Sequence, residues 1–355
     1  MKAETNNKAV PSAVRLSRGL VLLVRLGIVV YALVCLVAGG VLLLLQEDRS
    51  VIEFARTAYI LLILPVPLFV LLALIVFRRW LIVLLLPLAV VWVLYWLPVF
   101  IPRAHTAPPD VPVISVLSFN ILTYYEGYED VVALIEEADA DIVALQQISF
   151  EIAAVIEDYL AERYPYRQIH PQTSPWQYYR GQAVLSKYPI LEDAYWLFED
   201  LDFYSHGQQR SVVEIDGQPV VVYNVHPWAA FLWEGRAKLS FPQVQDDAHR
   251  IATLRLLEQA ESETLPVIFA GDFNMSDQFF EYGAVSAHFT DSYRAVGYGA
   301  GMTYPACGLG PLPSLIRLDY VFHSAHFTSL SSEVRDACGV SDHHAVLTYL
   351  ALTDI

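Results

Sequence analysis

Three long apolar runs occupy the first third of the chain and constrain its fold more than any other feature. They cover residues 19–45, 58–77 and 81–101, and the only charged side chain within them is Arg25. A helix of about 20 apolar residues can cross a hydrocarbon layer of roughly 30 Å. We therefore predict three transmembrane helices, rather than buried core helices or a cleaved signal peptide, for which the first run is too long.

The charges around these runs predict an anchor and its orientation. None of the runs contains an acidic residue, which favours an anchor over an ion or proton pathway. Basic residues flank the runs at Lys2, Lys8, Arg15, Arg18, Arg78 and Arg79. The positive-inside rule then places the N-terminus in the cytoplasm, at a plasma (inner) membrane, and everything after the third run outside. Residues 102–112 contain four prolines, which predicts a stiff linker to a domain at residues 113–355.

The rest of the chain alternates short apolar runs with helical patterns, which predicts an α/β fold. The strand-like runs are residues 113–119, 141–146, 182–186, 211–215, 220–225, 267–270, 318–323 and 345–350. The helical patterns cover residues 129–138, 150–163 and 234–261. Such a mixture predicts sheets flanked by helices.

The apolar run at residues 267–270 ends in Gly271-Asp272-Phe273-Asn274. Because residues two apart on a strand share one face, Asp272 and Asn274 are expected to reach the same atom beyond the strand end. A turn whose side chains bond the backbone is the alternative. Polar residues stand at the ends of other strand-like runs too, at Asn120, Gln147, Asn224, His226, Asp319 and Ser341-Asp342-His343-His344. Together they predict the rim of one site.

In this order, these residues resemble the endonuclease/exonuclease/phosphatase superfamily, the deoxyribonuclease I-like phosphoesterases. The matching segments are residues 118–120, 141–146, 181–190, 224–226, 271–274, 318–322 and 341–343. The resemblance covers about two thirds of the chain. It implies two facing β-sheets flanked by helices, a four-layer sandwich, with the site at one end.

The resemblance also implies a metal-dependent phosphoric ester hydrolase and gives roles to individual residues. Asp272 would orient or deprotonate the attacking water, and His343 would be the acid/base group with its tautomer held by Asp319. The implied catalytic residues are His226, Asp272, Asn274, Asp319 and His343. Contacts with the phosphate are implied for Asn120, Asn274 and His226. Arg210, just before the strand-like run at residues 211–215, is a further candidate for a substrate contact. An ordinary surface arginine is the alternative for Arg210.

The implied metal ligands are Gln147 and Asp342, with Mg²⁺ or Mn²⁺ as the cation. The family has a glutamate where this chain has Gln147. An amide oxygen can bind a hard cation but brings no negative charge, which Asp342, Asp319 or Glu151 could supply instead. Two interpretations stay open: an active hydrolase, or a catalytically impaired binding or scaffold domain of the same fold.

Charge bears on the class of substrate. Residues 106–355 carry 34 acidic and 12 basic side chains. Since non-specific nucleic-acid binding depends on Lys and Arg, a lipid headgroup or a small phosphodiester is favoured over nucleic acid, and an extracytoplasmic nuclease is a further alternative. The acidity could equally serve only to keep the domain soluble.

Aromatic residues at positions 176–179 and 228–233 could form a lip for lipid or bases, with simple packing as the alternative. No protein partner is predicted.

The three cysteines do not form a disulfide framework. Cys35 lies within the first apolar run and is expected to be an inert apolar residue. Cys307 and Cys338 could pair in an oxidising compartment, but the sequence does not supply their distance. Their pairing stays open.

Overall fold

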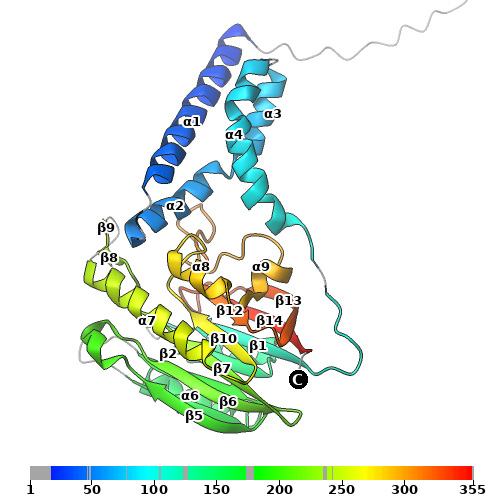
Figure 1. Cartoon of the computed structure of the whole chain (residues 1–355), viewed down its shortest axis with the longest axis vertical. Helices are drawn as coiled ribbons and strands as arrows, with labels where there is room; N and C mark the ends of the chain where they lie inside the picture. The colour runs from blue at the N-terminus through cyan, green and yellow to red at the C-terminus, as the bar shows by residue number, and fades with distance from the viewer. Residues whose placement is uncertain are drawn as a thin grey trace, which may run out of the picture.

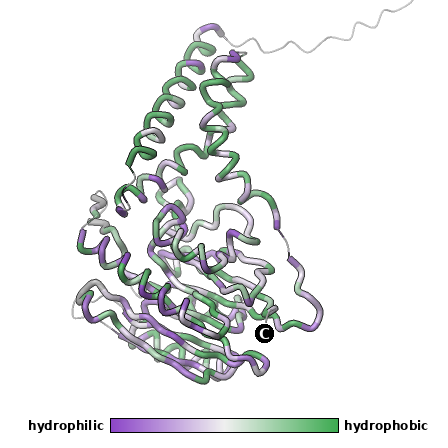
Figure 2. The backbone as a smooth tube through the Cα atoms, in the orientation of Figure 1, coloured by the Kyte–Doolittle hydropathy of each residue, from purple (hydrophilic) through white to green (hydrophobic). Residues whose placement is uncertain are grey.

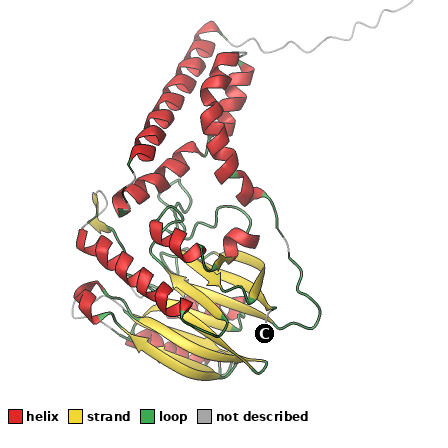
Figure 3. Cartoon of the chain, viewed as in Figure 1, coloured by secondary structure: helices red, strands yellow, loops and turns green. Residues whose placement is uncertain are grey.

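The computed structural model describes residues 17–353 apart from positions 46, 48, 77, 104, 123–126, 173–179, 235–237 and 242. Lys2, Lys8, Arg15 and the aromatic residues at positions 176–179 therefore lie outside the described residues. A group of N-terminal helices stands on one end of a globular domain (Figures 1 and 3). Apolar residues dominate the helices, whereas the domain is mixed (Figure 2).

The N-terminal part contains α1 (Arg18–Leu44), α2 (Ser50–Ile63), α3 (Val66–Ile75), α4 (Arg79–Tyr95) and the short 3₁₀ helix η1 (Leu97–Phe100). Among the described residues, two helical stretches are long and apolar enough to cross a membrane, Arg18–Leu44 and Ser50–Ile75. The third predicted span differs, because α4 has only 17 residues. A proline disfavours the α conformation in the residue before it, and Pro98 lies just beyond the end of α4.

The second predicted span, residues 58–77, also differs from the structure. Its helix begins eight positions earlier, at Ser50, and turns at Leu64 and Pro65 between α2 and α3. A proline ends a helix readily because it lacks an N–H donor and its ring clashes with the preceding turn. As a result α2 lies across the end of the domain, whereas α1, α3 and α4 extend away from it (Figure 1).

The domain contains two six-stranded sheets. The first has the order β13-β14-β1-β2-β4-β3, with β1 (Val113–Asn120), β2 (Ile142–Ile148), β3 (Tyr166–His170), β4 (Gly181–Ser186), β13 (Phe327–Arg335) and β14 (Ala345–Leu352). The second has the order β11-β12-β10-β7-β6-β5, with β5 (Ile190–Trp196), β6 (Gln208–Ile215), β7 (Gln218–Val225), β10 (Val267–Asp272), β11 (Thr290–Asp291) and β12 (Asp319–His323). Both are mixed, since β1 runs parallel to β2 and β7 parallel to β10.

The two sheets pack face to face with helices outside them, as predicted. Alternate residues of β1 show this: Val116 packs between the sheets, whereas Leu117 packs against the helices. The helices α5 (Tyr128–Ala138) and α6 (Phe150–Leu160) cover the outer face of the first sheet. The helices α7 (Gln243–Glu261) and α8 (Phe280–Ser286) cover that of the second. The short elements are η2 (Glu199–Tyr204), β8 (Leu232–Glu234), β9 (Lys238–Ser240) and α9 (Ser292–Val296).

The helix predicted at residues 234–261 is wrong at its start. Residues before α7 form the hairpin β8–β9 instead, and α7 begins at Gln243. The sequence Phe241-Pro242 accounts for the difference, because the residue before a proline avoids the α conformation and a proline suits a helix start.

The structure pairs Cys307 with Cys338, whose Cα atoms are 4.7 Å apart. The disulfide joins the loop before β12 to the loop before β14. Both loops lie next to the residues predicted to form the site.

Candidate functional site

Asp272, the last residue of β10, accepts hydrogen bonds from two predicted site residues. Its Oδ2 accepts from Asn120 Nδ2 at 2.9 Å, and its Oδ1 accepts from the backbone N of Asn274 at 2.9 Å. The preceding Gly271 allows the close approach of β7, because a Cβ there would lie 2.0 Å from the carbonyl oxygen of Val225. The ends of β1 and β10, which belong to different sheets, therefore meet at this carboxylate.

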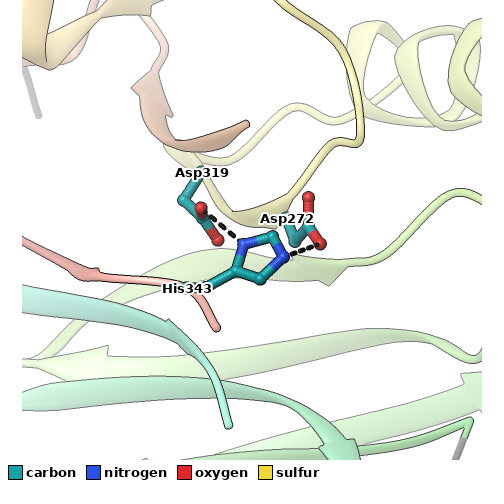
Figure 4. A group of neighbouring side chains, drawn as sticks. All are labelled: Asp272, Asp319 and His343. Atoms are coloured by element: carbon teal, nitrogen blue, oxygen red, sulfur yellow. Dashed lines mark hydrogen bonds and ion pairs between the residues drawn. The ribbon is translucent and has the colours of Figure 1, made fainter. Parts of the chain in front are cut away.

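His343 lies between two buried carboxylates (Figure 4). Its Nδ1 is 2.9 Å from Asp319 Oδ2, and its Nε2 is 3.6 Å from Asp272 Oδ2. Asp272 and Asp319 are paired across the neighbouring strands β10 and β12. Ser341 positions the histidine loop, because its hydroxyl donates to the carbonyl of Asn120 at 2.7 Å and accepts from the backbone N of His343 at 3.1 Å.

The carboxylates determine the charge of this imidazole. Burial alone would lower the pKa of His343, but Asp319 and Asp272 together raise it to about 10. Burial raises the pKa of Asp272 above its usual range, and burial does the same for the pKa of Asp342. A protonated imidazole whose Nδ1 donates to Asp319 can offer its Nε2–H to an oxygen of a bound phosphate.

Two further histidines lie beside Asp272. His226 Nε2 is 3.5 Å from Asp272 Oδ2 and 3.2 Å from Nδ1 of His206. Burial, and then the neighbouring His206, hold the pKa of His226 well below its usual range. Burial, and then Arg180, lower the pKa of His206 to about 3. Both rings are therefore neutral at pH 7 and act as uncharged hydrogen-bonding groups.

The donor atoms in this cluster fit a divalent cation. Asp272 and Asp319 each offer a carboxylate oxygen, and these two atoms and a ring nitrogen of His343 lie within 4.8 Å of one another. While the imidazole is protonated, the two carboxylates are the groups of this cluster that can bind a cation. Two buried carboxylate oxygens, Asp319 Oδ1 and Asp342 Oδ1, have no hydrogen-bond partner among the described residues. Buried anionic oxygens without a donor are expected where a cation binds, since burial of an uncompensated charge is costly. Hard cations such as Mg²⁺ prefer oxygen ligands of this kind.

Gln147 occupies an irregular position in β2. It is the extra residue of a β-bulge between Gln146 and Ile148, and its φ is 67°. Gly181 faces this bulge, where a Cβ would lie 2.1 Å from the carbonyl oxygen of Ile148. Bulges re-aim side chains and are common next to active sites. The role of Gln147 as a metal ligand stays a prediction.

Asn274 and Arg210 differ from the geometry expected of them. β10 ends at Asp272, so Asn274 lies in the turn beyond it, with a φ of 51° and its Nδ2 donating to the carbonyl of Pro227 at 3.0 Å. Arg210 forms ion pairs with Glu263 at 2.6 Å and Glu192 at 3.2 Å. These contacts favour the alternative of a structural arginine, and a phosphate contact by Arg210 stays untested.

Two aromatic residues of the site were not predicted. His206 contacts His226 with ring centroids 4.0 Å apart, and Tyr304 contacts His343 with centroids 4.9 Å apart. His206 comes just before β6, which pairs with β7 and so with the strand that ends near His226. The pairing of β6 with β7 could therefore have indicated that His206 lies near His226. Tyr304 lies in a loop and has no such signal in the sequence.

Residues 117–343 match the model described as the Endonuclease/Exonuclease/phosphatase family. The chain belongs to this family. The match confirms the resemblance drawn from the strand-end residues and covers every predicted site residue. Endonuclease/exonuclease/phosphatase family members are metal-dependent phosphoesterases, to which the buried Asp272, Asp319 and His343 cluster corresponds in chemistry. No curated protein matches the chain.

Solved structures of the family share the fold. An endonuclease/exonuclease/phosphatase from Beutenbergia cavernae is 18% identical, with 68% of this chain and 72% of that one covered at a TM-score of 0.51. A family protein from Leptotrichia buccalis is 15% identical, with 67% of this chain and 99% of that one covered at a TM-score of 0.53. A mannosyl-6-phosphatase from Bacteroides thetaiotaomicron is 17% identical, with 67% of this chain and 99% of that one covered at a TM-score of 0.50. At these identities the likeness concerns the fold alone.

Proposed function

We propose that this protein is a membrane-anchored, divalent-cation-dependent phosphoesterase that hydrolyses phosphodiester or phosphomonoester bonds outside the cytoplasm. The observation that carries the proposal is the buried Asp319–His343–Asp272 arrangement, with Asn120 hydrogen-bonded to Asp272, in a chain of this family. The acidic domain favours a lipid headgroup or a small phosphodiester over nucleic acid as substrate.

Each chemical requirement of ester hydrolysis has a residue that meets it. Asp272 orients or deprotonates the attacking water, and Asn120, Asn274 and His226 hydrogen-bond the phosphoryl oxygens. His343, held by Asp319, presents Nε2 to the phosphate or to the leaving oxygen. The side chain of Arg210 is already taken up by carboxylates, so it is the weakest of the predicted phosphate contacts.

The cation, Mg²⁺ or Mn²⁺, would neutralise charge on the phosphoryl oxygens when it is bound. The carboxylates of the cluster, Asp342 and the amide oxygen of Gln147 are the groups that would hold it. The free oxygens of Asp319 and Asp342 support this assignment.

Metal removal tests the proposed function directly. We expect the purified full chain to hydrolyse bis(4-nitrophenyl) phosphate with Mg²⁺ or Mn²⁺, and EDTA to lower the rate by about 100-fold or more, because metal ions supply several kcal/mol of charge stabilisation. Release of nitrophenolate measures the rate. Turnover that is indifferent to EDTA, and to restored cation, would show that the reaction does not use the metal.

The Cys307–Cys338 disulfide supports an extracytoplasmic position of the domain, because it suits an oxidising compartment. The apolar stretches Arg18–Leu44 and Ser50–Ile75 support the membrane anchor. A C-terminal alkaline phosphatase fusion should therefore be active, and a C-terminal green fluorescent protein fusion exported in the same way should be dark. The opposite pair of results would place the domain in the cytoplasm.

A second candidate function follows from Gln147, which brings no charge to the metal site. In that case the domain binds a phosphoester without hydrolysing it. The variant Gln147→Glu distinguishes the two, because restoring a carboxylate should strengthen cation binding. We expect the natural protein to be active and Gln147→Glu to need less Mg²⁺ for half-maximal rate. Activity found only in Gln147→Glu would favour the binding domain.

A further inference from the structure

The helix α2 is attached to the domain through one polar face. Ser50, Glu53 and Thr57 recur at helical spacing and are buried on one face of this helix. The hydroxyl of Ser50 donates to Asp246 at 2.5 Å, Glu53 accepts from the backbone N of Phe280 at 2.7 Å, and the Thr57 hydroxyl is 2.5 Å from that of Ser276. Since Ser276 is two residues beyond Asn274, α2 lies over the end of the domain that carries the site.

The C-terminal end of α4 and the following η1 form a second attachment. The hydroxyl of Tyr95 donates to the carboxylate of Asp277 at 2.8 Å, and the backbone N of Gly299 donates to the carbonyl of Val99 at 2.7 Å. Arg294 also contacts both Tyr95 and Asp277. Two separate attachments fix the position of the apolar helices relative to the catalytic domain.

Between α2 and the loop that precedes β12 is a cavity of about 610 Å³. This volume lies within the range of about 300–1,000 Å³ that is usual for small-molecule sites. Its walls are largely apolar, with Phe54, Ala58 and Leu61 on α2 and Leu309, Leu315 and Ile316 on the domain. Among the residues that the structure describes, no charged side chain lines it.

The cavity adjoins the catalytic cluster through one residue, Tyr304. Tyr304 lines the cavity, and its ring also contacts the ring of His343. The backbone N of Ala306 donates to the carbonyl of Asp342 at 2.7 Å, and the Cys307–Cys338 disulfide joins the same two loops. At the outer side Leu309 is 50% exposed. One wall of the cavity is therefore rigidly connected to the loop that carries His343.

We infer that this cavity binds the hydrocarbon chain of a lipid phosphoester whose phosphate lies at Asp272 and His343. The inference rests on the proposed function and narrows its substrate to a lipid. An uncharged apolar wall favours a hydrocarbon chain over a sugar or a nucleotide. The other wall is α2, which belongs to the apolar stretch Ser50–Ile75, so a chain can enter from the side of the bilayer without crossing water.

A series of alkyl 4-nitrophenyl phosphodiesters tests the inference, because the reacting bond stays the same while the chain grows from methyl to dodecyl. With the full chain in phosphatidylcholine nanodiscs, we expect kcat/KM to rise by about 10-fold or more along the series. The variant Ala58→Trp, which fills the cavity, should abolish most of this rise. Leu309→Asn, from the opposite wall, should reduce it. The matched control Ala55→Trp is on the same helix at an exposed position that does not line the cavity, and it should keep the rise.

The Ala55→Trp control distinguishes binding in the cavity from partition of the substrate into the bilayer. Partition of the dodecyl ester into the nanodisc is the same for every variant, so only the ratio of Ala58→Trp to Ala55→Trp reports on the cavity. Hydrolysis of the methyl ester without any rise along the series, or an equal rise in both variants, would overturn the inference and leave the proposed function standing. Absence of hydrolysis of every ester would count against the proposed function instead.

If no ester is hydrolysed, a binding measurement still tests the inference. A phosphatidic acid with a photoreactive group at the end of one acyl chain should label residues 304–316 in the natural chain and in Ala55→Trp. Labelling of this segment should fall by about 10-fold in Ala58→Trp. Unlabelled residues 304–316, or equal labelling in both variants, would overturn the inference whatever the activity. Loss of a dimer in Ala58→Trp without a change in labelling would assign the cavity to a second copy of the chain.

Discussion

Replacing His343 by alanine is expected to lower kcat for a soluble phosphodiester by about 1,000-fold, within the range usual for loss of a general acid or base. The ring is held by Asp319 at 2.9 Å and stands 3.6 Å from Asp272, so it is the group best placed to exchange a proton with the substrate. Initial rates of nitrophenolate release from bis(4-nitrophenyl) phosphate at saturating Mg²⁺ measure the loss.

The alanine variant also leaves two buried carboxylates without their shared partner, which threatens the fold. His343→Gln avoids this because its amide can still donate to Asp319, but it cannot transfer a proton, so its kcat should fall as far. The matched control is His344→Ala. His344 adjoins His343 but accepts from the backbone N of Ala337 and contacts Ser314, both outside the cluster. It should keep kcat within about threefold, and a His343→Gln enzyme as active as His344→Ala would exclude His343 as the acid/base group.

The strands that the sequence predicted are the interior strands of the two sheets. All eight predicted runs became β1, β2, β4, β6, β7, β10, β12 and β14. Within these two sheets the missed strands, β3, β5, β11 and β13, are the four edges, and the separate hairpin β8–β9 was missed as well. Edge strands are covered on fewer sides and carry polar residues, as the serines of β13 show, so they lack a continuous apolar run. Hydrophobic runs in this sequence thus identify the interior strands of the two sheets but not the edge strands.

The same reasoning explains which parts of the site could be predicted. Asn120, Asp272 and Asp319 each belong to an interior strand, whose buried run points to the polar residue at its end. Tyr304 contacts His343 from a loop. The polar face of α2 contacts segments about 200 positions away, as Thr57 contacts Ser276 at a separation of 219 residues. Local patterns carry no information on such contacts. The polar face of α2 also explains why the apolar-run criterion placed the start of this helix too late, since Ser50, Glu53 and Thr57 interrupt the run.

The substitution Asp272→Asn should lower kcat about as strongly as loss of His343, by about 1,000-fold, because it removes the only carboxylate that contacts both Asn120 and the imidazole among the described residues. Nitrophenolate release again measures the rate. Burial raises the pKa of Asp272, so the folded protein disfavours the charged form, and its stability falls as pH rises through the titration of this group. A neutral asparagine is therefore not expected to lower the melting temperature measured at pH 7 in EDTA.

A buried carboxylate with a structural role provides the contrast. Asp291 pairs with Arg317 at 2.6 Å, so Asp291→Asn should lower the melting temperature while leaving kcat nearly unchanged. Asn120→Ala should lower kcat by a smaller factor. The double variant Asn120→Ala/Asp272→Asn should be little worse than Asp272→Asn alone, because both changes remove the same hydrogen bond. Losses that multiply would mean that Asn120 and Asp272 act at separate places, and the arrangement of the site derived from their contact would then be wrong.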